Sequence, residues 1–399
     1  MAPCGIGLGH ITRTRPIAEE LSQRGIETVF STYLDGLEFA KHEHLPTYEA
    51  VPINFKVTSD GTIDFKLTAA TSGFSLGIRR FLRQVVREIQ YMKHFRPDVV
   101  FSDSRASSLL AARLLRIPVV LMLNQFRVEI IRRPSSRRLS LFDRLFFFIA
   151  NIGWLFIRTT IGLVWGRSQV ILIPDFPPPY TICQGNLGIP KRYNKKVRLI
   201  GPIVDNHNHQ SIEQDRIHSQ LGLDSGKPLV YAAVSGPRVE RNILARILLD
   251  SLQRMSEHYN VVLSRGEPSG NRSPRLVSGV RIYDWIENQD DFISASDVIV
   301  SRAGHGIMMK SLVYGKPMVL IPIPDHTEQY SNARRAIFLH VAGMIDQNRL
   351  TPETLESAIQ EILKAGRYKV NAASIRDTVI SMRAIPVACD IITSLANRG

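Results

Sequence analysis

The residues best suited to chemistry lie between 301 and 336, in SRAGHGIMMKSLVYGKPMVLIPIPDHTEQYSNARRA. Gly304, His305 and Gly306 stand between a predicted strand and a predicted helix. A glycine turn at a helix N-terminus exposes backbone N–H groups that can bind a phosphate. The polar loop behind the next strand carries Asp325, His326, Glu328, Gln329 and Asn332. Together these features predict a site for a phosphorylated ligand with hydroxyl groups, such as a nucleotide sugar.

Two residues of the first half are candidate catalytic bases. His10 follows GIGLG and opens a predicted helix, where the helix dipole disfavours the imidazolium and leaves a neutral ring able to take a proton. Asp103 ends a predicted buried strand, and strand ends of this kind face the ligand crevice of α/β folds. The structural alternatives are that His10 orients the glycine loop and that Asp103 caps the next helix.

Strands and helices alternate along both halves of the chain, which predicts parallel doubly wound sheets. In the first half we expect strands at 2–4, 26–33, 97–104, 117–125 and from 169 onward. In the second half we expect them at 228–238, 259–266, 280–286, 297–304 and 318–324. The fold class is therefore α/β, with two Rossmann-like domains facing a cleft. We place the first at 1–200 and the second at 201–375, and we expect the helix of 376–399 to return to the first domain.

The helix predicted at 76–95 has an apolar side and a basic side. Its apolar residues are Ile78, Phe81, Leu82, Val85, Val86 and Ile89, and its arginines are Arg79, Arg80, Arg83 and Arg87. This division is typical of an amphipathic helix.

The net charge of +14 is concentrated in one half of the chain. Residues 1–200 hold 28 Lys and Arg against 15 Asp and Glu, whereas residues 201–399 hold 22 against 21. Such asymmetry predicts that the first half meets an anionic surface.

Three widely spaced cysteines predict a reducing compartment, and the absence of a basic-then-apolar leader predicts no signal peptide. We therefore expect a cytoplasmic protein.

Residues 126–168 interrupt the alternation of strands and helices. Arg132, Arg133, Arg137 and Arg138 precede an aromatic-rich apolar stretch that includes Trp154. This composition suits an anionic membrane interface, on the inner face of the membrane. The uncharged run Leu145–Ile157 is shorter than the roughly 20 residues that span a bilayer. The alternative is a buried helix pair, and nucleic acid is disfavoured because the aromatics are not interleaved with basic residues.

GIGLGH, the Gly201–Pro202 junction, the Ser235–Gly236 turn and SRAG…GKPMVLIPIP…EQYSNA resemble the GT-B glycosyltransferases. The likeness is greatest to the peptidoglycan-type N-acetylglucosaminyltransferase of glycosyltransferase family 28 and its archaeal relatives, and it is strongest at 297–336. It implies an inverting, metal-independent transfer from a nucleotide-sugar donor, expected to be UDP-linked. The C-terminal domain would bind this donor, and the N-terminal domain would bind an acceptor that is often a membrane lipid.

The resemblance also implies roles for individual residues. Gly304, His305 and Gly306 would hold the donor diphosphate, with Ser235 and Gly236 opposite them. Trp285 and Ile286 would meet the uracil, and Gln329 and Asn332 would read the sugar. The acceptor side would comprise Gly7 and Gly9 with the four arginines and Trp154.

Three further positions bear on the donor site. Lys310 stands where the family has a glutamate for the ribose, and a lysine cannot accept those hydrogen bonds; we expect it to pair with a phosphate or with Glu328. Arg265 ends a strand of the second domain and can reach the diphosphate bidentately. Arg302 precedes the glycine turn, and we expect it to make a structural ion pair.

The function predicted is transfer of a sugar, expected to be an N-acetylhexosamine, from a nucleotide diphosphate to a lipid-linked or other membrane acceptor. No cofactor or metal is expected. One alternative is a nucleotide-sugar 2-epimerase, which shares the two-domain fold and needs no acceptor. The other is a non-catalytic donor-binding subunit that works with a partner subunit.

Overall fold

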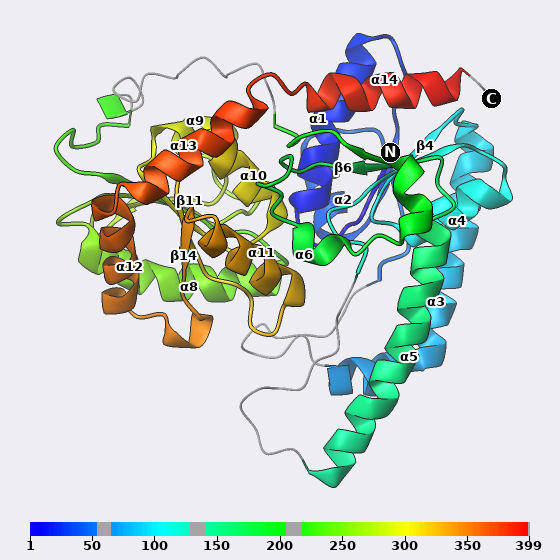
Figure 1. Ribbon diagram of the computed structural model, residues 1–399, viewed down its shortest axis with the longest axis horizontal. Helices are drawn as coiled ribbons and strands as arrows, with labels where there is room; N and C mark the ends of the chain where they lie inside the picture. The colour runs from blue at the N-terminus through cyan, green and yellow to red at the C-terminus, as the bar shows by residue number, and fades with distance from the viewer. Residues whose placement is uncertain (54–64, 128–139, 205–217, 220, 398–399) are drawn as a thin grey trace.

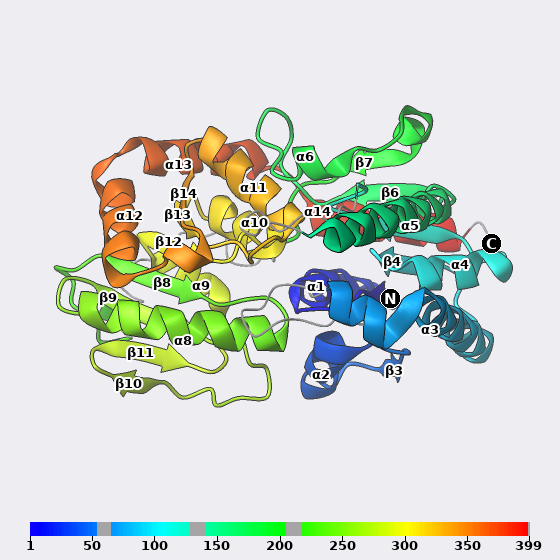
Figure 2. The same cartoon turned by 90° about the horizontal axis from the view of Figure 1, so that it is seen from below.

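The computed structural model describes residues 1–53, 65–127, 140–204, 218–219 and 221–397. Figures 1 and 2 show two α/β bodies side by side, with the N-terminal half on one side and most of the C-terminal half on the other. Each body is built on a parallel sheet, as the alternation of strands and helices predicts.

The N-terminal body contains a five-stranded parallel sheet in the order β1-β4-β5-β6-β7. These strands are β1 (Ala2–Pro3), β4 (Val100–Asp103), β5 (Val119–Met122), β6 (Val170–Ile173) and β7 (Val197–Leu199). Two short strands, β2 (Phe30–Thr32) and β3 (Thr47–Glu49), pair with each other in a small parallel sheet of their own. The strand predicted at 26–33 is therefore shorter than expected.

Helices cover both faces of this sheet. They are α1 (Gly9–Gln23), α2 (Leu34–His42), α3 (Phe65–Phe95), α4 (Ala106–Leu114), α5 (Leu141–Trp165) and the short α6 (Gln184–Leu187), followed by a 3-10 turn at Lys191–Lys196. Alternate residues of β5 serve opposite faces, since Leu121 packs towards α3 and α4 whereas Val120 packs towards α1. Burying each such side chain stabilises the fold by about 1.5–3 kcal/mol.

The C-terminal body contains a seven-stranded sheet in the order β10-β11-β9-β8-β12-β13-β14. Its strands are β8 (Leu229–Ala233), β9 (Asn260–Ser264), β10 (Arg275–Val277), β11 (Val280–Tyr283), β12 (Val298–Ser301), β13 (Met318–Leu320) and β14 (Ala342–Met344). Every pairing is parallel except that of β10 with β11. The carboxyl ends of the central strands therefore meet at one edge, where α/β folds bind ligands.

The helices of this body are α8 (Arg238–Met255), α9 (Gln289–Ala295), α10 (His305–Val313), α11 (Thr327–Phe338), α12 (Pro352–Lys364) and α13 (Arg367–Val379), with a 3-10 turn at Gln347–Arg349. The chain then crosses back, and α14 (Ala384–Ala396) lies against α1 of the N-terminal body (Figure 1). Ala388 and Ile392 of α14 are buried in one cluster with Ile17 and Leu21 of α1. This packing ties the end of the chain to the first body.

Helix α3 differs from its prediction in length. It begins at Phe65 rather than near 76, and of its apolar residues Val85 is buried, whereas Ile78, Leu82 and Val86 are exposed. Only one edge of the apolar side is covered, because α4 packs against that edge.

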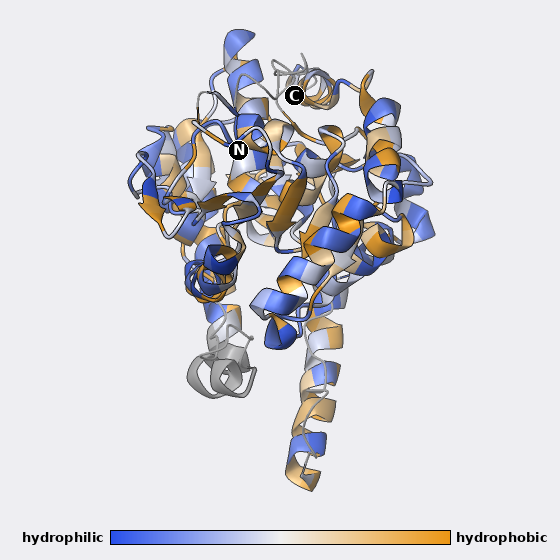
Figure 3. Ribbon diagram, turned by 90° about the vertical axis from the view of Figure 1, so that its left-hand side faces the viewer, coloured by the Kyte–Doolittle hydropathy of each residue, from blue (hydrophilic) through white to orange (hydrophobic). Residues whose placement is uncertain are grey.

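Helix α5 is the most unusual element of the fold. It projects away from the N-terminal body (Figures 1 and 3), and its 25 residues correspond to a length of about 37 Å. Only Phe147, Gly162 and Trp165 of this helix are buried. The alternative that this segment forms a buried helix pair in the core is therefore wrong.

Two stretches of the described residues are long and apolar enough to cross a membrane by length and composition alone, α5 and residues 367–396. The second stretch consists of α13 and α14, whose apolar residues have the two cores to pack against. Core helices of soluble proteins pass the same test. Among these two stretches, α5 is the one whose apolar side chains are largely exposed.

Candidate active site

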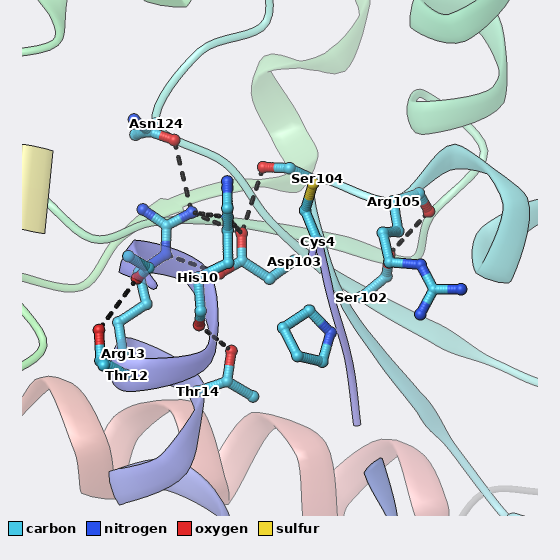
Figure 4. Close-up of polar contacts among 12 residues, drawn as sticks. Cys4, His10, Thr12, Arg13, Thr14, Ser102, Asp103, Ser104, Arg105 and Asn124 are labelled. Atoms are coloured by element: carbon cyan, nitrogen blue, oxygen red, sulfur yellow. Dashed lines mark hydrogen bonds and ion pairs between the residues drawn. The ribbon is translucent and has the colours of Figure 1, made fainter. Parts of the chain in front are cut away.

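His10 and Asp103, predicted as rival bases, lie together in one site (Figure 4). His10 is the second residue of α1, and Asp103 is the last residue of β4. Nδ1 of His10 lies 2.9 Å from Oδ1 of Asp103 and 3.1 Å from Nη2 of Arg13. In the tautomer that donates from Nδ1 to the carboxylate, which only accepts, Nε2 is the basic nitrogen.

Asp103 is suited to orienting His10 rather than to taking a proton itself. Its side chain is fully buried, and Nε and Nη2 of Arg13 both donate to its carboxylate. Burial alone would raise the pKa of Asp103, but the guanidinium of Arg13, and then His10, outweigh it and hold that pKa well below its usual range. His10, by contrast, keeps 24% of its side chain exposed and is open to a substrate.

The polar loop of the C-terminal body meets this site from the other side. Nδ2 of Asn124, just after β5, donates to Oε1 of Glu328 at 2.6 Å. Asn124 also lies 3.4 Å from Nη2 of Arg13. A chain of polar contacts therefore runs from the His10–Asp103 pair to the loop that carries the predicted sugar-reading residues.

The side chains of Gln329 and Asn332, predicted to bind the sugar, make hydrogen bonds within the protein. Oε1 of Gln329 accepts from the backbone N–H of Ile323 at 2.9 Å, and Nδ2 of Asn332 donates to the carbonyl of Ala303. Oδ1 of Asn332 accepts from Asn186 of α6 at 2.8 Å. Both side chains are buried, so they shape the loop and join the two bodies in this structure.

The predicted glycine loops of the two bodies touch each other. Gly7 and Gly236 both have positive φ, and a Cβ on Gly7 would lie 3.6 Å from the carbonyl carbon of Gly236. A Cβ on Gly304 would lie 3.8 Å from Oγ of Ser235. The loops predicted to hold the acceptor and the donor therefore converge on one place, and Gly9, the first residue of α1, borders it.

His305 contacts the N-terminal body, and its predicted contact with the donor stays a prediction. It is buried, and its Nε2 lies 3.2 Å from Oδ2 of Asp175, which follows β6 of the N-terminal body. Gly304 and Gly306 still flank it at the start of α10, and a Cβ on Gly306 would have no neighbour within 4 Å. The contact between His305 and Asp175 therefore connects this turn to the N-terminal body.

Asp175, Cys183 and His305 also have ligand atoms within 4.8 Å of one another. The carboxylate of Asp175, however, already accepts from His305 and from three backbone N–H groups, at Phe176, Ile182 and Cys183. Burial raises the pKa of the Cys183 thiol well above its usual range, so it keeps its proton. These contacts favour a hydrogen-bonded cage over a metal centre.

Lys310 pairs with a carboxylate that the prediction did not name. Its Nζ lies 2.6 Å from Oδ1 of Asp290 in α9, whereas Glu328 is bonded to Asn124. The predicted pairing with Glu328 is therefore wrong. Arg265 is likewise engaged, with Asp284 at 3.0 Å and Glu267 at 3.1 Å, which leaves little positive charge for a diphosphate.

Trp285 and Ile286 follow β11, but they sit differently. Ile286 is buried in the core, and the ring of Trp285 packs edge-on against Phe39 of α2, with centroids 5.9 Å apart. The guanidinium of Arg272 lies 6.0 Å from the same ring. Trp285 therefore contributes to the contact between the two bodies.

The predicted membrane segment is partly covered by the structure. Trp154 lies on α5 among exposed apolar side chains, which include Phe142, with 86% of its surface exposed, and Phe148, with 63%. Arg132, Arg133, Arg137 and Arg138 lie outside the described residues. A second basic and apolar surface runs along α3, where Arg79, Leu82, Arg83, Val86 and Arg87 line a groove of about 590 Å³.

Sequence reasoning missed several residues of the site, chiefly Arg13, Asn124, Asp175 and Asn186. Arg13 lies one helical turn after His10, and Asn124 and Asp175 follow β5 and β6, so helix spacing and the positions of strand ends point to all three. Nothing in the sequence marks Asn186, whose side chain donates to Asn332 of the other body.

Solved structures with the same arrangement are glycosyltransferases. The calicheamicin glycosyltransferase CalG4 aligns over 100% of this chain and 98% of its own, with a TM-score of 0.66 and 15% identity. MurG of Acinetobacter baumannii aligns over 98% of this chain and 99% of its own, with a TM-score of 0.57 and 16% identity. At such identities the likeness concerns the fold.

Curated relatives share more of the sequence. An uncharacterized glycosyltransferase of Methanosarcina mazei is 26% identical over 92% of this chain and 90% of its own length. A UDP-N-acetylglucosamine–N-acetylmuramyl-(pentapeptide) pyrophosphoryl-undecaprenol N-acetylglucosamine transferase of Rubrobacter xylanophilus is 23% identical over 96% of this chain and 99% of its own length.

Two parallel-sheet bodies meet at a histidine, two glycine loops and a polar loop. This chain is a glycosyltransferase with the GT-B fold. Residues 239–381 match the Glycosyltransferase family 28 C-terminal domain. This part of the chain therefore resembles family 28, as the sequence at 297–336 predicted.

Proposed function

We propose that this protein is an inverting, metal-independent glycosyltransferase acting on a lipid-linked acceptor at the cytoplasmic face of a membrane. It would transfer an N-acetylhexosamine from a nucleotide diphosphate, for which UDP is the first choice. The observation that carries the proposal is the His10–Asp103 pair, 2.9 Å apart, at the meeting point of the two bodies.

The arrangement supports base catalysis by His10. Nε2 of His10 would take the proton of the acceptor hydroxyl while that oxygen forms a bond to the anomeric carbon of the donor sugar. The bond from the anomeric carbon to the diphosphate oxygen breaks on the opposite face, which inverts the configuration. Asp103, ionised beside Arg13, would stabilise the imidazolium formed on His10.

The leaving diphosphate needs its charge stabilised. Helix α10 has nine residues and begins at His305, directly after Gly304, where a Cβ would lie 3.8 Å from Oγ of Ser235. The partial positive charge of such a helix end favours the diphosphate. The His305–Asp175 contact would hold this helix end in place.

The choice of sugar rests on the relatives. The enzyme of Rubrobacter xylanophilus is named for the transfer of N-acetylglucosamine, and the pair of Asn124 and Glu328 lies where a donor sugar would meet the N-terminal body. Both side chains can form hydrogen bonds with sugar hydroxyl groups.

The choice of a membrane acceptor rests on α5 and α3. Exposed aromatic and aliphatic side chains along α5, and separately the arginines of α3, match the composition of surfaces that bind anionic membranes. A lipid-linked acceptor would then be presented to the N-terminal body from the membrane.

The enzymatic proposal is tested with purified protein, a panel of nucleotide sugars and a polyprenyl-phosphate or glycolipid acceptor, with the products read by mass spectrometry. His10→Asn should lower kcat about 10²–10⁴-fold, while His94→Asn on the exposed end of α3 serves as a control. If the nucleotide sugar is converted to its 2-epimer when no acceptor is present, the protein is an epimerase and not a transferase. Binding of a nucleotide sugar without turnover until a partner subunit is added would establish the donor-binding subunit instead.

The membrane proposal is tested by co-sedimentation with liposomes that contain anionic lipid. Phe142→Asp and Phe148→Asp, tested separately, should each lower the partition coefficient about 10- to 100-fold, because each removes the burial of one aromatic side chain. Val370→Asp is the matched control, since Val370 is 67% exposed on α13 of the other body. Equal binding by all the variants would refute a membrane role for α5.

A further inference from the structure

Three buried charged side chains of the C-terminal body lack partners for part of their polar surface. One of them, Arg241, lies 3.4 Å from the carboxylate of Asp35 in the N-terminal body, and the other two are Glu240 and Arg302. Glu240, the third residue of α8, is 3% exposed, and Arg302, directly after β12, is 1% exposed. Oε2 of Glu240 and Nε of Arg302 are buried without a hydrogen-bond partner. Leaving such atoms unpaired is costly, so their presence calls for a reason.

Both residues lie at the edge of the sheet where a ligand is expected. A Cβ on Gly236 would lie 3.5 Å from Oε2 of Glu240 and 3.8 Å from Cδ1 of Ile323. Nη1 of Arg302 donates to the carbonyls of Ile321 and Pro322, just after β13. The unpaired atoms therefore lie beneath the loops that follow β8, β12 and β13.

Structural roles do not account for the pair. Helix α8 has no side-chain hydrogen bond at its N-cap, so Glu240 does not serve as a capping partner there. Arg302 was predicted to make a structural ion pair, and in the described part of the chain no carboxylate forms one with it. Burial raises the pKa of Glu240 to about 7 and lowers that of Arg302 to about 10, and each group partly offsets the shift of the other. The two groups are thus near one another without being joined.

We propose that Glu240 and Arg302 bind the acetamido group of the transferred sugar beneath the Gly236 loop. The carboxylate would accept the amide N–H, and Nε of Arg302 would donate to the amide carbonyl. An acetamido group offers one donor and one acceptor side by side, which matches one unpaired acceptor and one unpaired donor. This inference rests on the proposed function, because it names the residues that select its donor sugar.

The charges of the pair also favour this ligand over a phosphate. A carboxylate beside the guanidinium cancels much of the field that would attract an anion. A neutral polar group satisfies both side chains without adding charge to a buried site. The pair therefore belongs to the sugar subsite rather than to the diphosphate.

The test measures the dissociation constants of UDP-N-acetylglucosamine, UDP-glucose and UDP for the wild type and for two variants of Glu240. Glu240→Leu removes the acceptor and should weaken UDP-N-acetylglucosamine about 10- to 100-fold, with UDP and UDP-glucose unchanged. Glu240→Gln keeps a carbonyl oxygen in place and should recover most of the loss. Asp250→Asn, on the exposed side of the same helix, is the control.

The outcomes separate this inference from the proposed function. If the wild type binds no nucleotide sugar, the proposed function fails first. If it binds UDP-N-acetylglucosamine and Glu240→Leu weakens all three ligands equally or none of them, only the sugar-reading role of Glu240 is overturned. Retained binding of UDP by Glu240→Leu shows that the variant is folded.

Discussion

The buried carboxyl of Glu240 makes a quantitative prediction about stability and pH. Burial raises its pKa from the ordinary 4.5 to about 7, since removal from water penalises the ionised form. At about 1.36 kcal/mol per pKa unit, the difference between the folded and unfolded chains corresponds to about 3 kcal/mol. The perturbation is Glu240→Gln, which keeps the shape of the side chain and removes its titration.

The sign follows from the protons that each state binds. Between pH 4.5 and 7 the folded chain holds a proton on Glu240 that the unfolded chain has already lost, so the stability of the wild type falls as the pH rises through this window. Above pH 7 the loss is complete. The variant lacks this fall, and at pH 8 it should exceed the wild type by up to about 3 kcal/mol relative to their difference at pH 4.5.

The assay is urea denaturation at pH 4.5, 6, 7 and 8, monitored by far-ultraviolet circular dichroism. Asp250→Asn carries the same chemical change on an exposed part of α8 and controls for changes in net charge. Stability profiles of wild type and Glu240→Gln that run parallel from pH 4.5 to 8 would refute the reasoning. Such a result would mean that Glu240 is ionised and satisfied in the folded state.

Three further predictions test the fold. Gly5→Ala should destabilise the protein by about 3 kcal/mol or more, because its Cβ would lie 1.9 Å from a backbone carbonyl oxygen, whereas Gly9→Ala, with no atom within 4 Å, should be tolerated; thermal melting compares them. Glu88→Gln breaks the buried ion pair with Arg105 and should cost about 3–5 kcal/mol in urea denaturation. Asp175→Asn should cost about 2–4 kcal/mol at pH 7; burial would raise the pKa of Asp175, but His305 outweighs it, so this loss should shrink as the pH falls through the lowered pKa.

Much of the fold was predictable from local patterns. The strands that end at Asp103 and Ser301 are short apolar runs followed by polar turns, and the alternation of such runs with helices leaves few arrangements other than parallel sheets. The helix that His10 opens was predictable because a glycine loop precedes an amphipathic stretch. These signals depend on neighbours in the chain, which the sequence displays directly.

The site was predictable only in part. His10 and Asp103 were both identified, but as rivals, since 93 positions separate them and only the pairing of β1 with β4 brings them together. Lys310 was recognised as unusual, yet its partner Asp290 comes from the preceding helix α9, which no local pattern connects to it. The burial of His305 against Asp175 likewise depends on how the two bodies meet.

The amino-acid sequence by itself determined the classes of element, the two parallel sheets, the glycine turns and the excess of positive charge in the first half, because each follows from composition or short-range spacing. The tertiary structure alone decided that Asp103 contacts His10, that Glu240 and Arg302 are both buried without a full set of partners, and that α5 projects from the core. Those outcomes depend on contacts between residues far apart in the chain, whose hydrogen bonds and packing are set only when the two bodies come together.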